Sequence, residues 1–378
     1  MNVEKLDMIF QWIKIGIFGL VISTPCLWMA AGEKQVFSYT EKRTLATFPL
    51  LPGRLSQVRG FFIKVDNYLN DHFGFRELMV YRYQREVKKR FKDVERITKV
   101  TKGVDNWYFY TGNDMLKDFT GSNLRSDNEL SEWLEDYRNK QKWLEQQGIQ
   151  YLLIIPPNKM TIYGDLLGEP WVEKRGRTRL SQLQSVMSEN DKSTFLDISQ
   201  ALLNGRHSGR LFFQSDTHWT EYGAFLGYLA IADRLESTFP QNHFKRDFTF
   251  SKTITRKCEK KANCGDLTLM LLEYETFEES FKTVDDYSSC TVPQSIDYRF
   301  SNLDMSAKDP YLAKACKSRR LKTIVFRDSF FEALEPYMTE NFNEVIYLWK
   351  KYDQANVEEL LRTFKPDIVI EERGERQL

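Results

Sequence analysis

The chain has 378 residues, which is enough for one large core or for a core with a small appendage. Its 54 Lys and Arg residues balance 53 Asp and Glu residues, so the formal net charge of +1 gives no indication of nucleic-acid binding. Aromatic residues make up 14% of the chain, which suits a well-packed core and is also compatible with a groove that binds sugars.

Near the N-terminus, residues 8–31 form an apolar stretch interrupted only by Gln11, Lys14 and short polar residues. It is long enough for the roughly 20 residues that a membrane helix needs, and Lys14 could extend its ammonium to the interface. A cleaved signal peptide ending near Ala30-Ala31-Gly32 is the alternative. We favour an uncleaved anchor, with residues 1–32 as cytoplasmic tip and membrane helix.

Cys26 lies inside the apolar stretch, and the other four cysteines, Cys258, Cys264, Cys290 and Cys316, lie in one late region. An even number in the soluble part favours an oxidising compartment and two disulfides, of which Cys258–Cys264 with Cys290–Cys316 is the simplest of three pairings. Zinc binding is a poor alternative because no C-x-x-C spacing occurs.

Helical and apolar patterns alternate along most of the chain. Residues 33–123 read as a connecting and covering segment, largely helical over Val58–Arg96 with a turn at Gly74. Residues 124–378 read as the main domain, an α/β fold whose mostly parallel sheet is flanked by helices. The strands are expected near Tyr151–Ile155, Thr194–Ile198, Lys322–Phe326, Val345–Leu348 and Asp367–Ile370, and the helices near Asp127–Gln147, Leu180–Met187, Glu221–Leu235, Ser329 onward and Val357–Phe364.

Residues 239–320 lose this alternation and hold all four late cysteines. We interpret them as a loop-rich insertion closed by disulfides, with the basic run Arg256–Lys261 as a solvated hairpin rather than a binding patch. The first strand is not followed by G-x-G-x-x-G, so dinucleotide binding is not expected.

The segment Ser215–Thr220 places Asp216 two residues before His218, one of only four histidines. In extended backbone both side chains would point to the same side, so the carboxylate could orient the imidazole and leave its other nitrogen to take a proton. A polar turn in which Asp216 or Thr220 caps the next helix is the alternative.

A nucleophile for this pair is available at Ser329, directly after the strand Lys322–Phe326 and at the start of a helix. Chemistry in open α/β sheets is concentrated where strands end and helices begin. The N–H of Ser329 or Phe330 could donate to an oxyanion, with the helix dipole in support. The simpler alternative is that Asp328 or Ser329 only caps the helix.

The Asp-x-His-Trp segment, followed much later by a strand and Arg327-Asp328-Ser329-Phe330, resembles the SGNH-type alginate O-acetyltransferase family, the AlgJ/AlgX-like or DHHW branch. Further short segments resemble the family's motifs along most of the soluble chain. They are Glu41–Pro49 (E-x-R-x-L-A-x-F-P), Asp71–Arg76 (D-x-F-G-x-R), Gly103–Phe109 (G-x-x-G-W-L-F, with Asn106 for the second glycine), Pro157–Tyr163 (P-x-K-x-x-x-Y) and Gly265–Leu267 (G-D-L).

The resemblance implies an SGNH-hydrolase-like catalytic domain in which Ser329 is the nucleophile, His218 the general base and Asp216 its orienting partner. It implies a bacterial inner-membrane protein with a single N-terminal pass and its domain in the periplasm or on the outer face. The substrate would be a hydroxyl of a secreted polysaccharide, and the acetyl donor would arrive from a multi-span membrane acyltransferase. Neither a metal nor an organic cofactor is needed. Because Arg327 replaces the glycine of the alginate enzymes, the polysaccharide is left open.

Further candidates for the oxyanion or the substrate are Asn158, Arg327, Trp219, Lys159 and Tyr163. A scaffold role is preferred for Lys159 and Tyr163, and Trp219 could stack on a sugar or pack beneath the site. The remaining histidines, at 72, 207 and 243, lack a carboxylate two residues before them. The same triad could serve an acetyl esterase, and a non-catalytic polysaccharide-binding subunit is the second alternative.

Overall fold

The computed structural model describes residues 3–31, 36–38, 43–90, 99–258, 264–271, 277–287, 290–293, 311–361 and 364–378. Outside the described residues lie positions 41 and 42 of the first family motif, the end of the expected helical segment Val58–Arg96, positions 259–261 of the basic run and parts of the 239–320 insertion. The chain forms two compact units. We call them the N-terminal unit (Met1–Thr98 with Leu269–Glu273) and the C-terminal unit (Lys99–Thr268 with Tyr274–Leu378).

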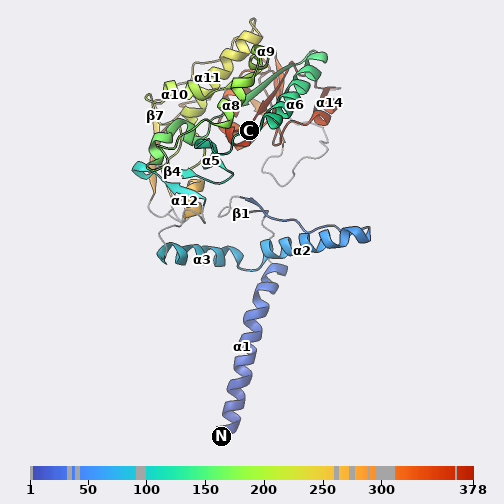
Figure 1. Ribbon diagram of the computed structural model, residues 1–378, viewed down its shortest axis with the longest axis vertical. Coiled ribbons are helices and arrows are strands. Elements are labelled where there is room, and N and C mark those ends of the chain that lie inside the picture. Colours follow the sequence, from blue (N-terminus) through green and yellow to red (C-terminus); the bar gives the residue numbers. More distant parts are fainter. Residues whose placement is uncertain are drawn as a thin grey trace. The chain divides into compact units, whose positions relative to one another are not determined.

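The N-terminal unit is mainly helical. Within it α1 (Val3–Ala31) is one continuous helix, and the segment Met8–Met29, with a mean hydropathy of 1.5, is long and apolar enough to cross a membrane (Figure 1). Two polar side chains inside that segment, Ser23 and Thr24, donate to the carbonyls of Gly19 and Leu20, so their hydroxyls are satisfied within the helix. The other elements are β1 (Phe37–Ser38), β2 (Arg43–Thr44), η1 (Leu55–Gln57), α2 (Val58–His72) and α3 (Arg76–Arg90).

The C-terminal unit is built on a seven-stranded mixed sheet with strand order β6-β5-β13-β11-β12-β10-β9. The strands from β6 to β12 are parallel, as expected, whereas β10 pairs antiparallel with both β12 and β9. Their bounds are β5 (Gln150–Ile155), β6 (Phe195–Asp197), β9 (Val292–Pro293), β10 (Tyr311–Ala315), β11 (Lys322–Phe326), β12 (Glu344–Leu348) and β13 (Ile368–Glu372).

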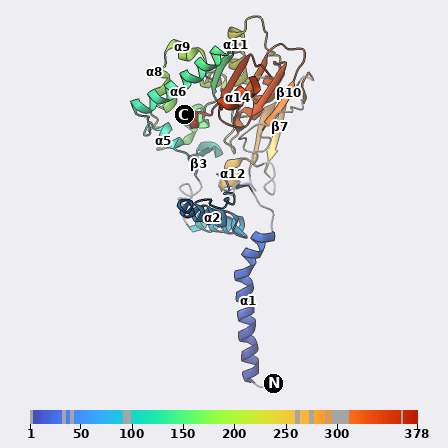
Figure 2. The ribbon, with the colours of Figure 1, turned by 90° about the vertical axis from the view of Figure 1, so that its right-hand side faces the viewer.

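Helices cover this sheet. One face packs on α6, α8 and α14, whose buried residues form a core with alternate side chains of β5, β11, β12 and β13, and Figure 2 shows α6 and α14 against the sheet. The helices are α5 (Met115–Phe119), α6 (Asp127–Gln146), α7 (Lys159–Tyr163), α8 (Arg179–Val186), α9 (Glu189–Ser193), α10 (Ser199–Gly205), α11 (Glu221–Thr238), α12 (Asp266–Leu271), α13 (Glu335–Thr339) and α14 (Gln354–Leu361), with short 3₁₀ turns η2 (Val104–Asn106), η3 (Gly164–Leu167), η5 (Ser329–Ala333) and η6 (Glu375–Gln377).

Local sequence explains where the main helices begin and end. In α6, Ser126 and Glu129 form a capping box, and after the helix Gly148 adopts a positive φ of 74° that favours glycine. The buried face of α11 is formed by Gly223, Ala224, Phe225, Gly227, Tyr228, Ile231, Ala232 and Leu235. The expected inward residues Tyr222, Leu226, Leu229 and Ala230 are only half-buried, and Val186 of α8 is exposed. At Gly223 and Gly227 the helix instead packs closely on the Leu211 carbonyl and the Trp219 ring.

The C-terminal unit begins at Lys99, earlier than the expected domain start at residue 124. Residues 99–123 belong to it because β3 (Val100–Lys102) and β4 (Tyr108–Tyr110) form a hairpin bonded to the unit. The Tyr108 N–H donates to the Gln214 carbonyl at 3.0 Å, and the Trp107 ring lies 4.3 Å from that of Tyr163. Aromatic residues that looked like a covering segment are therefore core residues here.

The described part of the 239–320 insertion contains the antiparallel hairpin β7 (Lys252–Lys257) and β8 (Glu278–Thr283) as well as both expected disulfides, Cys258–Cys264 and Cys290–Cys316. Arg256 in β7 differs from the expectation of a solvated basic run. Its guanidinium is ion-paired with the buried carboxylate of Glu279 at 2.5 Å. This pair joins the two strands of the hairpin, and the same two side chains link the hairpin to the rest of the unit: Arg256 donates to Ser215 Oγ at 2.8 Å, and Glu279 accepts the Gln214 N–H at 2.7 Å.

Removing the Cys290–Cys316 disulfide by a double serine substitution is expected to lower the free energy of unfolding by about 3–4 kcal/mol, because that bond closes the longer loop in the unfolded chain. The matched control is the double serine variant of Cys258 and Cys264. Their disulfide joins residues only six positions apart, so its removal should lower the free energy of unfolding by about 2 kcal/mol. Denaturant unfolding of both variants measures the difference. A larger loss in the control would contradict the loop-length argument.

Candidate active site

Asp216 and His218 lie in a bend, as in the polar-turn alternative, and not in the extended backbone that would also align their side chains. Asp216 Oδ1 accepts hydrogen bonds from both the backbone N–H of His218, at 3.0 Å, and its ring Nδ1, at 2.7 Å. This local turn, in which an aspartate bonds to the backbone two residues on, brings the side chains together without a strand. The expected carboxylate–imidazole contact therefore exists for a different backbone reason.

The other ring nitrogen, His218 Nε2, lies 2.8 Å from Ser329 Oγ, 111 residues further along the chain. Ser329 follows β11 and begins η5, and Asp328 caps this turn by accepting a 2.8 Å hydrogen bond from the Phe330 N–H. Ser329 is half-buried. Asp216, His218 and Ser329 form one hydrogen-bonded chain with the order of a carboxylate–imidazole–hydroxyl triad.

Trp219 packs beneath this chain rather than presenting a ring to solvent. It is buried, and its indole N–H donates to the Phe330 carbonyl at 2.9 Å. Phe330 also contacts the His218 ring, with a centroid separation of 5.1 Å. Of the two alternatives for Trp219, packing is the one that the structure supports, because it ties the histidine loop to the serine turn.

Lys159 is buried under the loop that carries Asp216. Its Nζ donates to the carbonyls of Tyr108 at 2.6 Å, Gln214 at 2.9 Å and Asp216 at 3.1 Å. Burial lowers the pKa of Lys159 to about 7, although the nearby carboxylates, Asp216 first, oppose this shift. An ammonium has three donors, and the three carbonyls use all of them, so the charged form fits this site and acts as scaffold.

Tyr163 is also part of the scaffold. It is buried, and its hydroxyl accepts a hydrogen bond from the Leu211 N–H at 3.1 Å. Leu211 begins the segment that leads to the Asp216–His218 bend, and the bridge between Phe212 and Trp219 closes that segment into a narrow loop. Lys159 and Tyr163 both follow β5 and both hold the same loop in place.

Sequence reasoning missed three charged residues that support this loop. Glu279 Oε2 accepts the Gln214 N–H at 2.7 Å, and Arg256 donates to Ser215 Oγ at 2.8 Å. Asp266 accepts two hydrogen bonds from Thr217, one from its N–H at 2.8 Å and one from its hydroxyl at 2.6 Å. Asp266 belongs to the Gly265–Leu267 motif, which was the only signal available for it. A Cβ on Gly265 would meet the Ser215 carbonyl at 2.1 Å, so glycine is required for this approach.

The charge of Asp216 is stabilised although its side chain is only 15% exposed. Burial raises its pKa, but the charge of His218, the two hydrogen bonds from His218 and the more distant Arg256 outweigh that effect and hold the pKa well below its ordinary value. Asp216 Oδ2 in addition accepts the Asp266 N–H at 3.1 Å. Asp216 is therefore a carboxylate over the working range of a histidine base, which is what an orienting partner needs.

A metal ion is the alternative occupant of this acidic corner, since ligand atoms of Asp216, His218 and Asp266 lie within 4.8 Å of one another. All four carboxylate oxygens already accept hydrogen bonds from the protein, two of them from Thr217 and one from the His218 ring. The donor set thus fits a hydrogen-bonded triad better than a cation site.

Asn158 and Arg327 lie just beyond the carboxyl ends of β5 and β11, which meet the same edge of the sheet on either side of β13. The Asn158 N–H donates to Glu375 Oε2 at 2.7 Å. Arg327 is buried with its guanidinium 4.6 Å from the Trp349 ring centre, and its Nε and Nη1 have no partner among the described residues. Within the described residues, neither side chain is hydrogen-bonded to Ser329.

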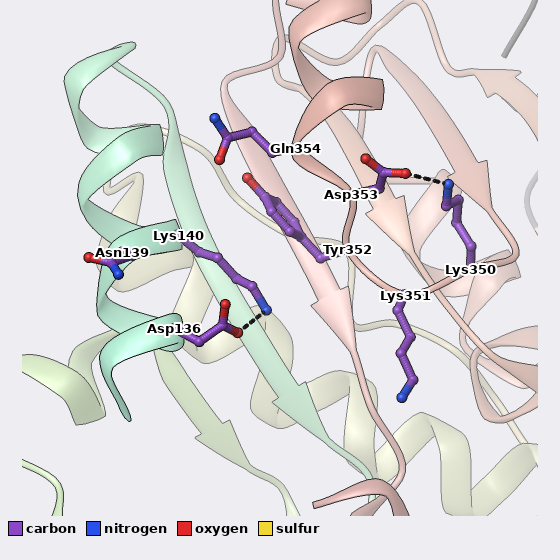
Figure 3. Close-up of a pocket in the computed structure, with 8 residues that line it drawn as sticks. All are labelled: Asp136, Asn139, Lys140, Lys350, Lys351, Tyr352, Asp353 and Gln354. Atoms are coloured by element: carbon purple, nitrogen blue, oxygen red, sulfur yellow. Dashed lines mark hydrogen bonds and ion pairs between the residues drawn. The ribbon is translucent and has the colours of Figure 1, made fainter. Parts of the chain in front are cut away.

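A cavity of about 500 Å³ lies between α6 and the segment linking β12 to α14 (Figure 3). Two of its lysines are paired, Lys140 with Asp136 at 2.8 Å and Lys350 with Asp353 at 2.7 Å. None of Asp216, His218 and Ser329 is among its lining residues. It is therefore separate from the hydrogen-bonded chain.

Comparison with known proteins identifies the family. The family model described as "SGNH hydrolase-like domain, acetyltransferase AlgX" matches residues 100–301, more than half of the chain. The chain belongs to this family. A curated relative, the probable alginate O-acetylase AlgJ of Pseudomonas aeruginosa strain PAO1, is 25% identical over 179 residues, which are 47% of this chain and 42% of that protein. The match thus spans less than half of that relative's length.

Among solved structures, Bacillus cereus PatB1 is similar with a TM-score of 0.50 and 15% identity, over 73% of this chain and 95% of that chain. At this identity the likeness concerns the fold alone. It agrees with the SGNH-like sheet of the C-terminal unit, and the expected fold class and family are confirmed.

In this SGNH-like domain, Lys159→Met is expected to lower the free energy of unfolding by roughly 2–4 kcal/mol, because three buried carbonyls lose their donor. The control is Lys142→Met on the exposed side of α6, which should change it by less than about 0.5 kcal/mol. Denaturant unfolding measures both. Equal losses in the two variants would show that Lys159 does not hold the loop.

The carboxyl group of Glu375 gives a pH dependence. Burial raises its pKa to about 7, while hydrogen bonds from Thr161 and Asn158 partly counteract this. A carboxyl whose folded-state pKa lies above its ordinary value of 4.5 contributes stability below that value and loses it as the pH rises through about 7.

Between about pH 5 and pH 8 the free energy of unfolding of the wild type should therefore fall by roughly 1–3 kcal/mol relative to that of Glu375→Gln. Unfolding at several pH values tests this, with exposed Glu132→Gln as control. Parallel profiles for the wild type and Glu375→Gln would contradict the raised pKa.

Proposed function

We propose that this protein is an O-acetyltransferase that moves an acetyl group through an acetyl-serine at Ser329 onto a hydroxyl of a secreted bacterial polysaccharide. The observation that carries the proposal is the chain from Asp216 through His218 to Ser329, with contacts of 2.7 and 2.8 Å. A base hydrogen-bonded to a hydroxyl on one side and to a half-buried carboxylate on the other is what activation of a weak nucleophile requires.

In the first half-reaction Ser329 Oγ attacks the acetyl carbonyl of the donor and its proton passes to His218 Nε2. The resulting imidazolium is stabilised by Asp216, which keeps Nδ1–H in place. When the tetrahedral intermediate collapses, the bond to the donor's leaving group breaks, and that group receives the proton from Nε2. The products are acetyl-Ser329 and the free leaving group.

In the second half-reaction a sugar hydroxyl takes the place of the leaving group. The hydroxyl proton passes to His218 Nε2 while the hydroxyl oxygen attacks the acetyl carbon. Collapse of the second tetrahedral intermediate then returns the proton to Ser329 Oγ. One acetyl group is moved and no proton is consumed. Water in place of the sugar would make the same site an esterase, so exclusion of water at the half-buried serine decides between the two outcomes.

The oxyanion of each intermediate needs donors beside the nucleophile. The Phe330 N–H is occupied by Asp328, which leaves the Ser329 N–H without a partner among the described residues. The Asn158 side-chain amide is likewise unbonded within the described chain, and it follows β5 at the same sheet edge. We assign these two groups to the oxyanion, with Arg327 as a further source of positive charge.

The acceptor class and the location rest on different observations. A relative named as an alginate O-acetylase supports a polysaccharide acceptor. The two disulfides suit an oxidising compartment, and α1 could anchor the chain in the inner membrane with the C-terminal unit outside the cytoplasm. An acetyl group taken from cytoplasmic metabolism would then need a multi-span membrane acyltransferase to deliver it.

The test incubates the purified chain with an aryl acetate and follows both aryl release and acetylation of Ser329 by peptide mass spectrometry. Ser329→Ala is expected to lower kcat/KM by about 10³-fold or more and to abolish the acetyl-peptide. His218→Ala should have a similar and non-additive effect, because base and nucleophile act as a unit. Ser193→Ala, at an exposed position of α9, is the matched control and should leave the rate unchanged.

Adding oligosaccharides then separates the two reactions. Acetyl transfer to sugar in excess of acetate release supports the transferase, and release to water that no oligosaccharide reduces supports the esterase. Equal turnover by the wild type and Ser329→Ala would overturn the triad.

A further inference from the structure

The N-terminal unit exposes apolar side chains along both α2 and α3. On α2, Phe62 and Leu69 are spaced seven residues apart, and Phe73 follows four residues later, so the three line up on one side. On α3, Met79 and Tyr83 are four residues apart and are 45% and 62% exposed. Apolar stripes of this kind on a water-exposed helix are unfavourable unless something covers them.

The turn between these helices is fixed to the end of α1. Gly74 packs so closely on α1 that an added Cβ would lie 2.1 Å from the Pro25 carbonyl oxygen, and the Phe75 ring lies 4.9 Å from that of Trp28. Pro25 and Trp28 are in the last turns of the apolar segment Met8–Met29. If that segment spans the bilayer, the turn lies at the depth of the headgroups, where tryptophan is enriched.

Charge is concentrated on α3. Its sequence holds six basic and two acidic residues, among them the exposed Arg82, Arg85 and Arg90. Basic residues beside apolar ones on a helix are the composition of helices that lie in the plane of an anionic membrane. Figure 1 shows α2 and α3 extending to opposite sides of the turn, as two such helices would.

We propose that α2 and α3 are interfacial helices that lie on the outer surface of the membrane crossed by α1. Phe62, Leu69, Met79 and Tyr83 enter the boundary between headgroups and acyl chains. Arg82, Arg85 and Arg90 of α3 contact anionic lipid headgroups. This rests on the proposed anchoring by α1 but not on the proposed acetyl transfer.

The test uses the full chain reconstituted at about one molecule per vesicle in phosphatidylglycerol and phosphatidylethanolamine, with brominated lipids as quenchers. Cys26 is the one cysteine outside the disulfides. In a Cys26→Ser chain, one further cysteine therefore gives a single position for a fluorophore. Labels are attached in Leu69→Cys, Tyr83→Cys, Ile17→Cys and Asn67→Cys. Asn67 is exposed on nearly the opposite side of α2 from Leu69, since two residues turn a helix by about 200°.

Fluorescence at positions 69, 83 and 17 is expected to fall by at least about half, and position 67 should change little. Replacing phosphatidylglycerol with zwitterionic lipid should weaken quenching at position 83, and no such change would overturn the headgroup contact. Quenching at 17 but not at 69 or 83 would overturn the proposal while leaving α1 as an anchor, and would assign the stripes to a protein partner. Quenching at 69 and 83 that appears only at high protein density would overturn it in favour of a second copy. No quenching at 17 would overturn the anchor as well.

Discussion

The structure of the site depends on one irregular loop, residues 214–218. Its polar groups need hydrogen-bond partners that no helix or strand ladder provides. Its groups are bound by charged side chains from distant segments: Lys159 after β5, Glu279 of β8 and Asp266 of α12. An unpaired buried polar group costs about 1–3 kcal/mol, so this loop could not keep one conformation without them. The insertion at 239–320 therefore has a physical role, because its described residues supply two of these three partners.

Much of the fold could be predicted because buried parallel strands and amphipathic helices have strong periodic signals. Tyr151–Ile155 is an uninterrupted apolar run and Lys322–Phe326 ends in the apolar run Ile324–Phe326, and the structure places β5 and β11 there. The strand β10, Tyr-Leu-Ala-Lys-Ala, has no such signal, since its stability comes from antiparallel pairing with β12 and not from its own composition. The start of the C-terminal unit at Lys99 has no sequence signal for a related reason: the aromatic residues of β4 are buried by contacts far away in the sequence.

The site divides in the same way. Asp216, His218 and Ser329 belong to short motifs at junctions where chemistry is expected, and the structure brings these three residues together. Arg256 and Glu279 could not be found from sequence, because a charged residue in a loop-rich region is usually solvated and only tertiary contact shows otherwise. Extended backbone around Asp216 would align the two side chains, yet the structure has a turn with the same side-chain contact, in which the His218 N–H donates to Asp216. Side-chain spacing alone does not distinguish these two geometries.

The last residues of the chain position the turn that carries Ser329, just as the insertion positions the loop that carries His218. Because β13 lies between β5 and β11, the segment that follows it runs across the edge where both neighbours end. Glu372 accepts the Asp328 N–H at 2.9 Å, Gln377 donates to Asp328 Oδ2 at 2.5 Å, and Glu375 holds the Asn158 N–H. The turn that carries Ser329 and the loop that carries Asn158 are thus positioned by one strand extension. Topology explains this arrangement, since only the strand between two others can reach both of their ends.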